Sequence, residues 1–251
     1  MARRPALVNV MVKAAYTAAK GLTRDFGEVE QLQVSKKGPS DFVSTADTKA
    51  EEVIFEILSD ARPDFSFVME ESGIKGDPKA ANRWIVDPLD GTLNFLHGIP
   101  HFAISLAAEE GGEVTACVIY DPIKDELYWA AKGIGAFVNH RRLRVSSRSN
   151  LAQAMLATGI PWASRRDHEE FSSELAQLMP KVAGIRRMGV ASLDLAYVAA
   201  GRFDGFWESQ LKSWDIAAGI LLVTEAGGLV SEKDGGKNML KTGSILATNE
   251  R

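Results

Sequence analysis

The stretch WIVDPLDGTLNFLHG, residues 84–98, places two carboxylates at the end of a short apolar strand. Asp87 and Asp90 are three residues apart, and Pro88 stiffens the turn expected between them. Such a turn can present both carboxylates and the intervening Leu89 carbonyl on one side. Hard divalent cations prefer this set of oxygen ligands. The stretch therefore predicts a cation site where the strand ends.

The two residues that follow, Gly91 and Thr92, are suited to a phosphate site. Gly91 lets the backbone approach a ligand closely, and Thr92 is expected to begin a helix. Backbone N–H groups at the start of a helix can hold a phosphate group. Together with the carboxylates, the pattern indicates a phosphorylated substrate bound beside a cation.

Two further acidic clusters occupy comparable positions. Glu70-Glu71 follows the strand expected over residues 65–69, and Asp215 precedes the apolar helix expected over residues 216–226. Functional side chains often emerge at strand ends and helix starts, because a rigid scaffold holds them there. Judged alone, each acid also has a simpler explanation as a helix N-cap, an exposed loop or a surface turn. Their joint occurrence favours one shared site.

The composition is that of an ordinary globular protein. Of 251 residues, 45% are hydrophobic and 25% charged, and the net charge of -4 argues against a broad basic face for nucleic acid. Cys117, the single cysteine, cannot form an internal disulfide, which fits a reducing compartment. No run of about eighteen apolar residues is present, so no membrane span is expected. Residues 7–18 have helical periodicity, which favours an amphipathic helix over a signal peptide, and a cytoplasmic protein.

The hydrophobic pattern predicts layered α and β structure in two parts. Residues 1–142 are expected to form a metal- and phosphate-binding α+β domain, with a sheet that is antiparallel because its connections are short. Residues 143–251 are expected to form an α/β domain that completes the metal and substrate site, after a polar boundary at 140–150. The expected helices cover residues 7–18, 46–60, 169–179, 192–200 and 216–226. The expected strands cover residues 65–69, 84–86, 102–108, 113–120, 126–131, 136–138, 154–158, 185–188, 203–207, 229–230 and 245–247.

Four motifs give the chain a resemblance to the inositol monophosphatase family. Residues 84–98 resemble the family's first signature, and WDIAAGILLVTEAGG, residues 214–228, resembles its second. MEESG, residues 69–73, matches the glutamate motif, and DFVSTADTKAE, residues 41–51, matches the threonine-activating segment. The motifs occur in the family's order and spacing over nearly the whole chain. The resemblance, which includes the bacterial extragenic-suppressor type, implies an α/β layered sandwich (α-β-α-β-α, sugar-phosphatase type), mixed antiparallel in its first half and α/β in its second.

The resemblance implies a site that binds two to three magnesium ions. Glu70, Asp87 and the Leu89 carbonyl would bind the first ion. Asp87, Asp90 and Asp215 would bind the second, and Glu70 would help to hold a third, weaker ion through water. A phosphate monoester is negatively charged near neutral pH, so a site lined by carboxylates requires cations between the acids and the substrate.

The resemblance also assigns catalytic roles to Glu70, Asp47 and Thr92. Asp47 and Thr92 would form a hydrogen-bonded pair that orients the attacking water, and the N–H groups of Gly91 and Thr92 would hold the phosphate. Transfer would be in-line and directly to water. No cysteine or histidine motif points to a covalent phosphoenzyme. Lithium is expected to inhibit by competing for one magnesium position.

On the substrate side, the resemblance implies that Asp90, the backbone N–H of Ala191 and the carboxylate of Glu208 bind a small phosphorylated polyol. Val190 stands before Ala191 where relatives carry a hydroxyl residue, which weakens the prediction for inositol itself. Leu93 replaces a threonine that is common in relatives, and a packing position of small effect is expected there.

Lys36 matches a family lysine on a mobile loop near the metals. An exposed loop lysine explains Lys36 equally well.

The favoured reaction is hydrolysis of myo-inositol 1-phosphate to inositol and phosphate. Relatives act on fructose 1,6-bisphosphate, NADP, histidinol phosphate or 3′-phosphoadenosine phosphates, and the shared metal motifs cannot separate these substrates. The short segment between Glu70 and Trp84 favours the monophosphatase branch. A catalytically inactive scaffold is disfavoured because all the motif acids are present.

A different class of function is binding to the transcription machinery, because some bacterial members also contact RNA polymerase or a transcription factor. The candidate contact patches are residues 140–144 with Arg148, and the pair Arg186-Arg187. An exposed charged face explains both patches more simply. The resemblance also predicts a homodimer.

Overall fold

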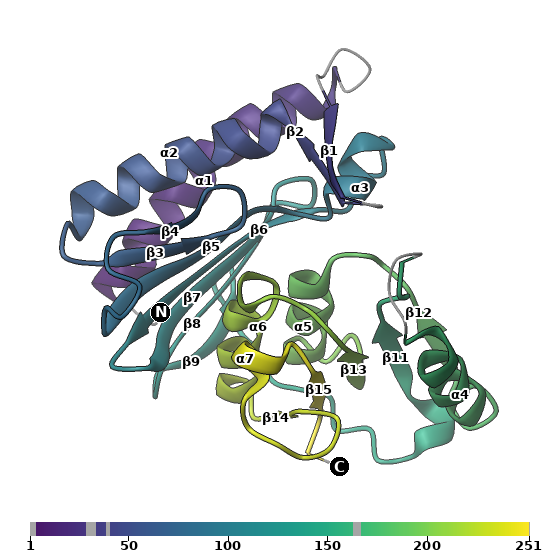
Figure 1. The fold of residues 1–251 in the computed structure, drawn as a ribbon. Helices are drawn as coiled ribbons and strands as arrows, with labels where there is room; N and C mark the ends of the chain where they lie inside the picture. The colour runs from purple at the N-terminus through teal and green to yellow at the C-terminus, as the bar shows by residue number, and fades with distance from the viewer. Residues whose placement is uncertain (1–3, 29–33, 39–40, 163–166, 251) are drawn as a thin grey trace.

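The computed structural model describes residues 4–28, 34–38, 41–162 and 167–250. These residues form alternating layers of helices and sheets (Figure 1). A pair of helices covers one face of a large sheet, a second pair covers its other face, and a smaller sheet and a further helix follow. The predicted layered α/β sandwich is therefore confirmed.

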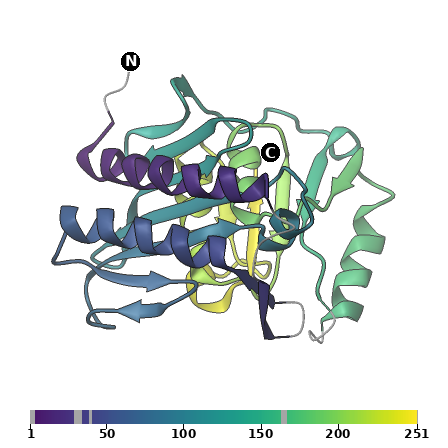
Figure 2. The same ribbon diagram turned by 90° about the horizontal axis from the view of Figure 1, so that it is seen from above.

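The outer helical layer consists of α1 (Ala6–Phe26) and α2 (Thr45–Ala61), which lie side by side across the large sheet (Figure 2). Both helices are amphipathic, as their sequences predict. Met11 and Leu22 of α1, and Ile54 and Leu58 of α2, are buried against the sheet. Burying such side chains is worth about 1.5–3 kcal/mol each, so this apolar stripe fixes the layer.

Within the described residues, eight strands form the large sheet in the order β10-β9-β8-β7-β6-β5-β3-β4. Neighbouring strands are antiparallel, as the short connections predict, except that β3 and β5 are parallel. A small separate hairpin is formed by β1 (Val34–Gly38) and β2 (Asp41–Ser44). The bounds of the large sheet are β3 (Ser66–Met69), β4 (Gly73–Lys75), β5 (Asn82–Asp90), β6 (Ala103–Glu110), β7 (Glu113–Asp121), β8 (Glu126–Ala131), β9 (Gly135–Val138) and β10 (Arg141–Arg142).

Strand β5 differs from its prediction in a way that shapes the site. The sequence predicts a strand that ends at Asp87 and then turns at Pro88, whereas β5 continues to Asp90. Asp87 pairs with Ser105 and Asp90 pairs with Ala103, so β5 has one more residue than β6 between these pairs. This extra residue is a β-bulge, which shifts the alternation of side chains by one position. Asp87 and Asp90 therefore face the same side, although an unbulged strand would point them to opposite sides.

The inner helical layer consists of α5 (Ala191–Ala199) and α6 (Ser213–Glu225). Every residue of α5 is buried, and α6 packs on the large sheet and on α5. A helix that is apolar on all sides belongs in a protein interior. Cys117 of β7 is buried beneath this layer, and burial raises the pKa of its thiol to about 12, which suits a structural role.

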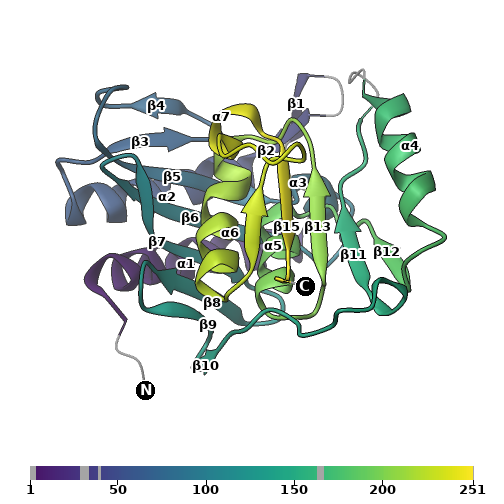
Figure 3. The same ribbon diagram turned by 90° about the horizontal axis from the view of Figure 1, so that it is seen from below.

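The smaller sheet has the order β12-β11-β13-β15-β14 among the described residues (Figure 3). Its first three strands are parallel and its last two pairs are antiparallel. The strands are β11 (Met155–Thr158), β12 (Gly184–Arg186), β13 (Gly205–Glu208), β14 (Leu229–Ser231) and β15 (Ile245–Thr248). The remaining helices are α3 (Thr92–Leu96), the 3-10 helix η2 (Leu151–Gln153), α4 (His168–Leu178) and α7 (Met239–Thr242).

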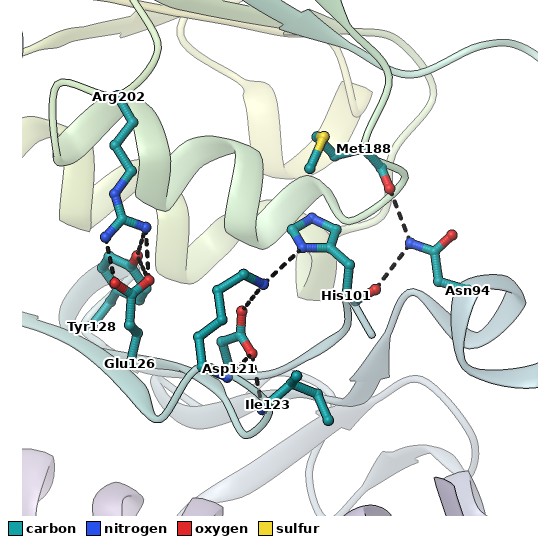
Figure 4. A network of polar contacts seen from close by, with 9 residues as sticks. Asn94, His101, Asp121, Ile123, Glu126, Tyr128, Met188 and Arg202 are labelled. Carbon is teal, nitrogen blue, oxygen red and sulfur yellow. Dashed lines mark hydrogen bonds and ion pairs between the residues drawn. The ribbon is translucent and has the colours of Figure 1, made fainter. Parts of the chain in front are cut away.

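Polar contacts hold α5 against the large sheet at its C-terminal end (Figure 4). Arg202, which follows α5, donates to a carboxylate oxygen of Glu126 at 2.7 Å and to the Tyr128 hydroxyl at 2.8 Å. Its guanidinium also lies 4.7 Å from the ring centre of Tyr197 in α5. Since Glu126 and Tyr128 belong to β8, these contacts join the two halves of the chain.

The division of the chain at residue 142 stays a prediction, although the two sheets lie on either side of it. Residues of both halves share one apolar cluster, which includes Ile85 and Ala107 from the large sheet and Leu195 and Leu222 from the inner helices. No helix among the described residues has the length and the apolar character that crossing a membrane requires.

Candidate active site

The carboxyl ends of β3 and β5 lie side by side because the two strands are parallel. Met69 pairs with Val86, and the N–H of Glu70 donates to the Val86 carbonyl at 3.2 Å. Glu70 therefore lies next to Asp87, and the two carboxyl groups share a hydrogen bond. The sequence placed both acids at strand ends, and the parallel pairing brings the ends together.

Asp215 joins the site from the second half of the chain. It lies in the first turn of α6, which packs on β5 and β6. The hydroxyl of Ser105 in β6 donates to the backbone carbonyl of Trp214 at 3.3 Å, which ties the start of α6 to the sheet. Asp215 thus approaches Asp90 and Glu70. Burial raises its pKa well above the usual value, and the charges of both acids raise it further.

Burial raises the pKa of Asp87, Asp90 and Asp215, and the charges of neighbouring acids add to the shift at Asp87 and Asp215. Burial raises the pKa of Asp87 well above its usual value, and the neighbouring charges of Glu70, Asp90 and Asp215 raise it further. Burial also raises the pKa of Asp90 to about 6, although hydrogen bonds from Ser192 and Ala191 oppose this shift. Ionising all these groups together is unfavourable in a buried site unless a positive charge is present. The all-oxygen donor set fits a hard divalent cation, which would supply that charge.

In three of these carboxylates, one oxygen accepts a hydrogen bond from a backbone N–H group. Asp87 accepts from the N–H of Leu89 at 3.0 Å, Asp90 from that of Ser192 at 2.7 Å, and Asp215 from that of Lys212 at 2.6 Å. A carboxylate has a second oxygen that a cation can bind. Across the part of the chain that the structure describes, no three His, Cys, Asp or Glu side chains stand in a ready coordinating arrangement.

Asp47 and Thr92 form the pair that the sequence predicts. Asp47 is buried in the first turn of α2, and its Oδ1 accepts from the Thr92 hydroxyl at 2.9 Å. The same hydroxyl lies 3.0 Å from the Leu89 carbonyl oxygen. Leu89 is itself buried, so its carbonyl is held at the base of the site. This contact links the outer helical layer directly to the bulged end of β5.

Glu51 is a contributor that sequence analysis missed. It is buried in α2, and its two carboxylate oxygens accept from the N–H groups of Glu71 at 2.8 Å and of Ser72 at 3.0 Å. These bonds hold the loop that begins with Glu70. The available signal was its position four residues after Asp47, because that spacing puts both acids on the same face of α2.

Gly91 and Val190 bring the phosphate loop and the substrate loop into contact. Gly91 has a φ of 95°, in the left-handed region that favours glycine. A Cβ added to Gly91 would lie 2.7 Å from a methyl group of Val190. Val190 is fully buried, so it packs against Gly91. The packing position expected at Leu93 was wrong, because Leu93 is 42% exposed.

Asn94 joins the same two loops through its side-chain amide (Figure 4). Its Nδ2 donates to the His101 carbonyl and to the Met188 carbonyl, both at 2.9 Å. Asn94 is buried in α3, two residues after Thr92. It therefore fixes the segment before Val190 relative to the phosphate loop.

The residues assigned to the polyol line one cavity of about 340 Å³. Asp90, Ala191 and Glu208 all line it, together with Glu70 and Asp215 from the acidic cluster. Ile160, Trp162, Arg187, Gln210, Lys212 and Trp214 supply further parts of its wall. Asp87 lies beneath the cavity, since it is almost fully buried. The structure thus brings together the predicted acids and the predicted substrate residues, whereas the side chain of Lys36 lies outside the described residues.

Comparison with known proteins gives one consistent result. The model of the inositol monophosphatase family matches residues 5–251. The chain belongs to the inositol monophosphatase family. It is accordingly a phosphatase, a hydrolase of phosphate monoesters.

Individual relatives agree with the family match over nearly their whole length. The inositol-1-monophosphatase of Mesorhizobium japonicum is 58% identical, over 98% of this chain and 93% of the relative. The Nus factor SuhB of Pseudomonas aeruginosa is 43% identical, over 98% of this chain and 92% of the relative. The crystal structure of the extragenic suppressor protein suhB from Bartonella henselae superposes with a TM-score of 0.95 at 56% identity, and covers 98% of this chain and 95% of that one. The fold is therefore that of the inositol monophosphatase family.

Proposed function

We propose that the chain catalyses magnesium-dependent hydrolysis of a small phosphorylated polyol, with myo-inositol 1-phosphate as the favoured substrate. The observation that carries the proposal is the joint position of Glu70, Asp87, Asp90 and Asp215 beside one cavity. These acids come from three separate segments of the chain. Burial and the charges of neighbouring acids raise the pKa of Asp87 and Asp215, so a cation among the four acids would relieve their repulsion. The name of the relative from Mesorhizobium japonicum, inositol-1-monophosphatase, supports the choice of substrate.

The acidic cluster would hold two to three magnesium ions. Glu70, Asp87 and the Leu89 carbonyl would bind the first ion, and Asp87, Asp90 and Asp215 the second, with Glu70 near a third. Bound magnesium would supply an acidified water and stabilise the charge that develops on the leaving oxygen.

Asp47 and Thr92 would orient the attacking water. Because the Thr92 hydroxyl donates its hydrogen to Asp47 at 2.9 Å, its oxygen lone pairs are directed away from Asp47 and can accept a hydrogen bond from water. The backbone N–H groups of Gly91 and Thr92 would hold the phosphate oxygens. The left-handed backbone at Gly91 turns the chain at this point, and the packing of Val190 against it keeps the loop in place.

Asp90, Ala191 and Glu208 would bind the polyol. Carboxylates suit this task because they accept hydrogen bonds from hydroxyl groups. Asp90 would serve both metal and substrate. Val190 carries no hydroxyl and is buried, so it would contribute shape rather than a hydrogen bond. Fructose 1,6-bisphosphate, NADP and histidinol phosphate remain alternative substrates, since all present the same phosphate group to the metal site.

Phosphate release from D-myo-inositol 1-phosphate tests the proposal, with fructose 1,6-bisphosphate, NADP and histidinol phosphate measured in parallel. Lithium should reduce the rate by competing for one magnesium position. Faster release from the inositol ester than from the other substrates is the expected result. Release from another substrate alone would retain the chemistry and reassign the specificity.

A second candidate function is contact with the transcription machinery. Relatives from Pseudomonas aeruginosa and Escherichia coli, 43% and 42% identical, carry the name Nus factor SuhB, which favours it. Of the two basic patches, Arg148 is engaged within the fold, because its Nε donates to both carboxylate oxygens of Asp204. Arg141, Arg142 and Arg144 are exposed, and so are both arginines of the second patch, Arg186 and Arg187. Salt-sensitive co-elution with RNA polymerase, lost on replacing both arginines by Ser, would support this role, and co-elution unaffected by the change would count against it.

We also propose a homodimer, as the family resemblance implies. Sedimentation equilibrium gives the mass directly and would distinguish a dimer from a monomer.

A further inference from the structure

The carboxylate of Glu208 occupies the space beside Gly159 where any other residue would place its side chain. A Cβ added to Gly159 would lie 2.0 Å from Oε1 of Glu208, 2.1 Å from Cδ and 2.2 Å from Oε2. Cβ atoms in proteins essentially never approach other heavy atoms within 3.0 Å. All three atoms of the carboxylate are therefore incompatible with a side chain at position 159.

The strand pairing explains why these residues meet. Thr158 of β11 pairs with Trp207 of β13, and the two strands are parallel. Gly159 comes directly after Thr158, and Glu208 directly after Trp207, so the two residues lie side by side. The Thr158 hydroxyl donates to the Trp207 carbonyl at 2.8 Å, which fixes this register. On its other side, Glu208 pairs with Ile245 of β15. The backbone of Glu208 is thus held in the sheet by its pairing with β15 and by the register of the preceding residue, Trp207, against β11.

The backbone of Gly159 does not itself require glycine. Among the described glycines, those with a positive φ do not include Gly159. Other residues can therefore adopt its backbone conformation without strain. The requirement for glycine comes from the neighbouring carboxylate.

Gly159 and Glu208 both line the 340 Å³ cavity of the candidate active site. The same two residues also line a second, much smaller cavity, together with Glu174, Trp207 and Lys233. Glu208 lies at the boundary between the two cavities. A side chain at position 159 would displace its carboxylate from this boundary.

We propose that Gly159 is a positioning residue that sets the carboxylate of Glu208 for binding the hydroxyl groups of the substrate. This inference rests on the proposed function, because it assigns the polyol end of the same site. Gly159 acts through Glu208 and has no contact with the reacting phosphate. The absence of a side chain at position 159 leaves room for the Glu208 carboxylate. This carboxylate would favour a polyol phosphate over a phosphate ester that has no hydroxyl groups to bind.

The test compares Gly159→Ala with wild type on D-myo-inositol 1-phosphate and on p-nitrophenyl phosphate, which has no polyol hydroxyl groups. Losing hydrogen bonds to a charged group should raise KM for the inositol ester by about tenfold or more. The kinetics with p-nitrophenyl phosphate should change by less than about twofold, since the metal site is untouched. Gly21→Ala is the matched control, because a Cβ at Gly21 meets no atom within 4 Å.

A rescue variant separates positioning from general damage. Glu208→Asp shortens the acid by one methylene group, which makes room for a methyl group at position 159. Glu208→Asp combined with Gly159→Ala should therefore bind the inositol ester better than Gly159→Ala alone. Equal losses on both substrates, or no rescue, would overturn the proposal, as would an unchanged KM in Gly159→Ala.

A crystal structure of Gly159→Ala decides the packing without reference to activity. Displacement of the Glu208 carboxylate from its present position is expected, and an unmoved carboxylate would contradict the proposal. If wild-type protein released no phosphate from either ester, the proposed function would fail. The crystal structure of Gly159→Ala would still show whether a side chain at position 159 displaces the Glu208 carboxylate.

Discussion

The hydroxyl of Thr92 donates to Oδ1 of Asp47 at 2.9 Å, which joins two residues 45 positions apart in the chain. Asp47 is fully buried, and Thr92 begins the short helix that follows the bulged end of β5. The bond therefore connects the outer helical layer to the acidic cluster. The Thr92 hydroxyl also lies 3.0 Å from the Leu89 carbonyl oxygen, at the place that we propose for the attacking water.

Replacing Thr92 by Val tests the role of this hydroxyl. Valine keeps the branched shape and removes the donor and acceptor. Loss of an oriented water should lower kcat by about 10²–10³-fold, with a smaller change in KM. Thr92→Ser retains the hydroxyl and is the control, for which a rate within about tenfold of wild type is expected. Equal rates in the Val and Ser variants would remove Thr92 from the mechanism.

Replacing Asp90 by Asn tests the acidic cluster. Asn can still accept the hydrogen bond that Ser192 donates at 2.7 Å, so the fold should persist. Turnover should fall by about three orders of magnitude, because a charged oxygen ligand is lost. The melting temperature should not fall at neutral pH, since burial already raises the pKa of Asp90 to about 6 and a neutral amide relieves that cost. Asp60→Asn, at an exposed site, is the control. A near-wild-type rate in Asp90→Asn would remove the metal assignment.

Replacing Asn94 by Leu tests the contact between the phosphate loop and the substrate loop. The change leaves the carbonyls of His101 and Met188 without their donor, and an unpaired buried group costs about 1–3 kcal/mol. The melting temperature should fall by about 4–10 °C, as measured by calorimetry. Asn9→Leu on the exposed side of α1 controls for loss of an asparagine and should shift it by less than about 1 °C. If both variants melted alike, the two bonds would not stabilise the loops.

His101 predicts a dependence of stability on pH. Burial, and then the charge of Lys124, lower the pKa of His101 to about 4, while Asp121 opposes the shift. Unfolded histidine binds a proton near pH 6.5, so between about pH 6.5 and 4 the unfolded state binds more protons than the folded state. Stability should therefore fall as pH decreases through this window, by up to about 3 kcal/mol from His101.

His101→Asn isolates this contribution. An asparagine oxygen can replace the ring nitrogen that lies 3.3 Å from Lys124 Nζ, and it does not titrate. Urea unfolding at pH 7 and pH 5 should show a larger loss of stability in wild type than in the variant. Parallel losses in the two proteins would mean that His101 does not carry the effect.

Local sequence signals predicted most elements and the clustered acids Glu70, Asp87, Asp90 and Asp215, but they did not reveal Glu51. The apolar periodicity of α1 and α2 located both helices, and the motif acids do lie where strands end or helices start. The bulge in β5 could not be predicted, because the turn signal of Asp87-Pro88 is the same for a turn and for a bulged strand. The pairing of β5 with β6 decides between a turn and a bulged strand. The pairing partners are distant in sequence, so a local pattern does not reveal them.

Contacts between distant residues account for what the sequence did not reveal. Glu208 meets Gly159 across 49 positions, and the register of β11 against β13 creates that contact. Asn94 reaches Met188 across 94 positions, through a loop whose path depends on the packing of α5. Neither Gly159 nor Asn94 stands in a local sequence pattern that would predict its distant contact.

The magnesium dependence of phosphate release from D-myo-inositol 1-phosphate tests the central claim most directly. The initial rate is measured after chelation with EDTA and again as magnesium is added back, in wild type and in Asp90→Asn. We predict no release from the chelated protein, a saturable recovery in wild type, and little recovery in Asp90→Asn. Release that is unaffected by chelation, or equal recovery in both proteins, would contradict the assignment of the acidic cluster as a magnesium site for phosphate hydrolysis.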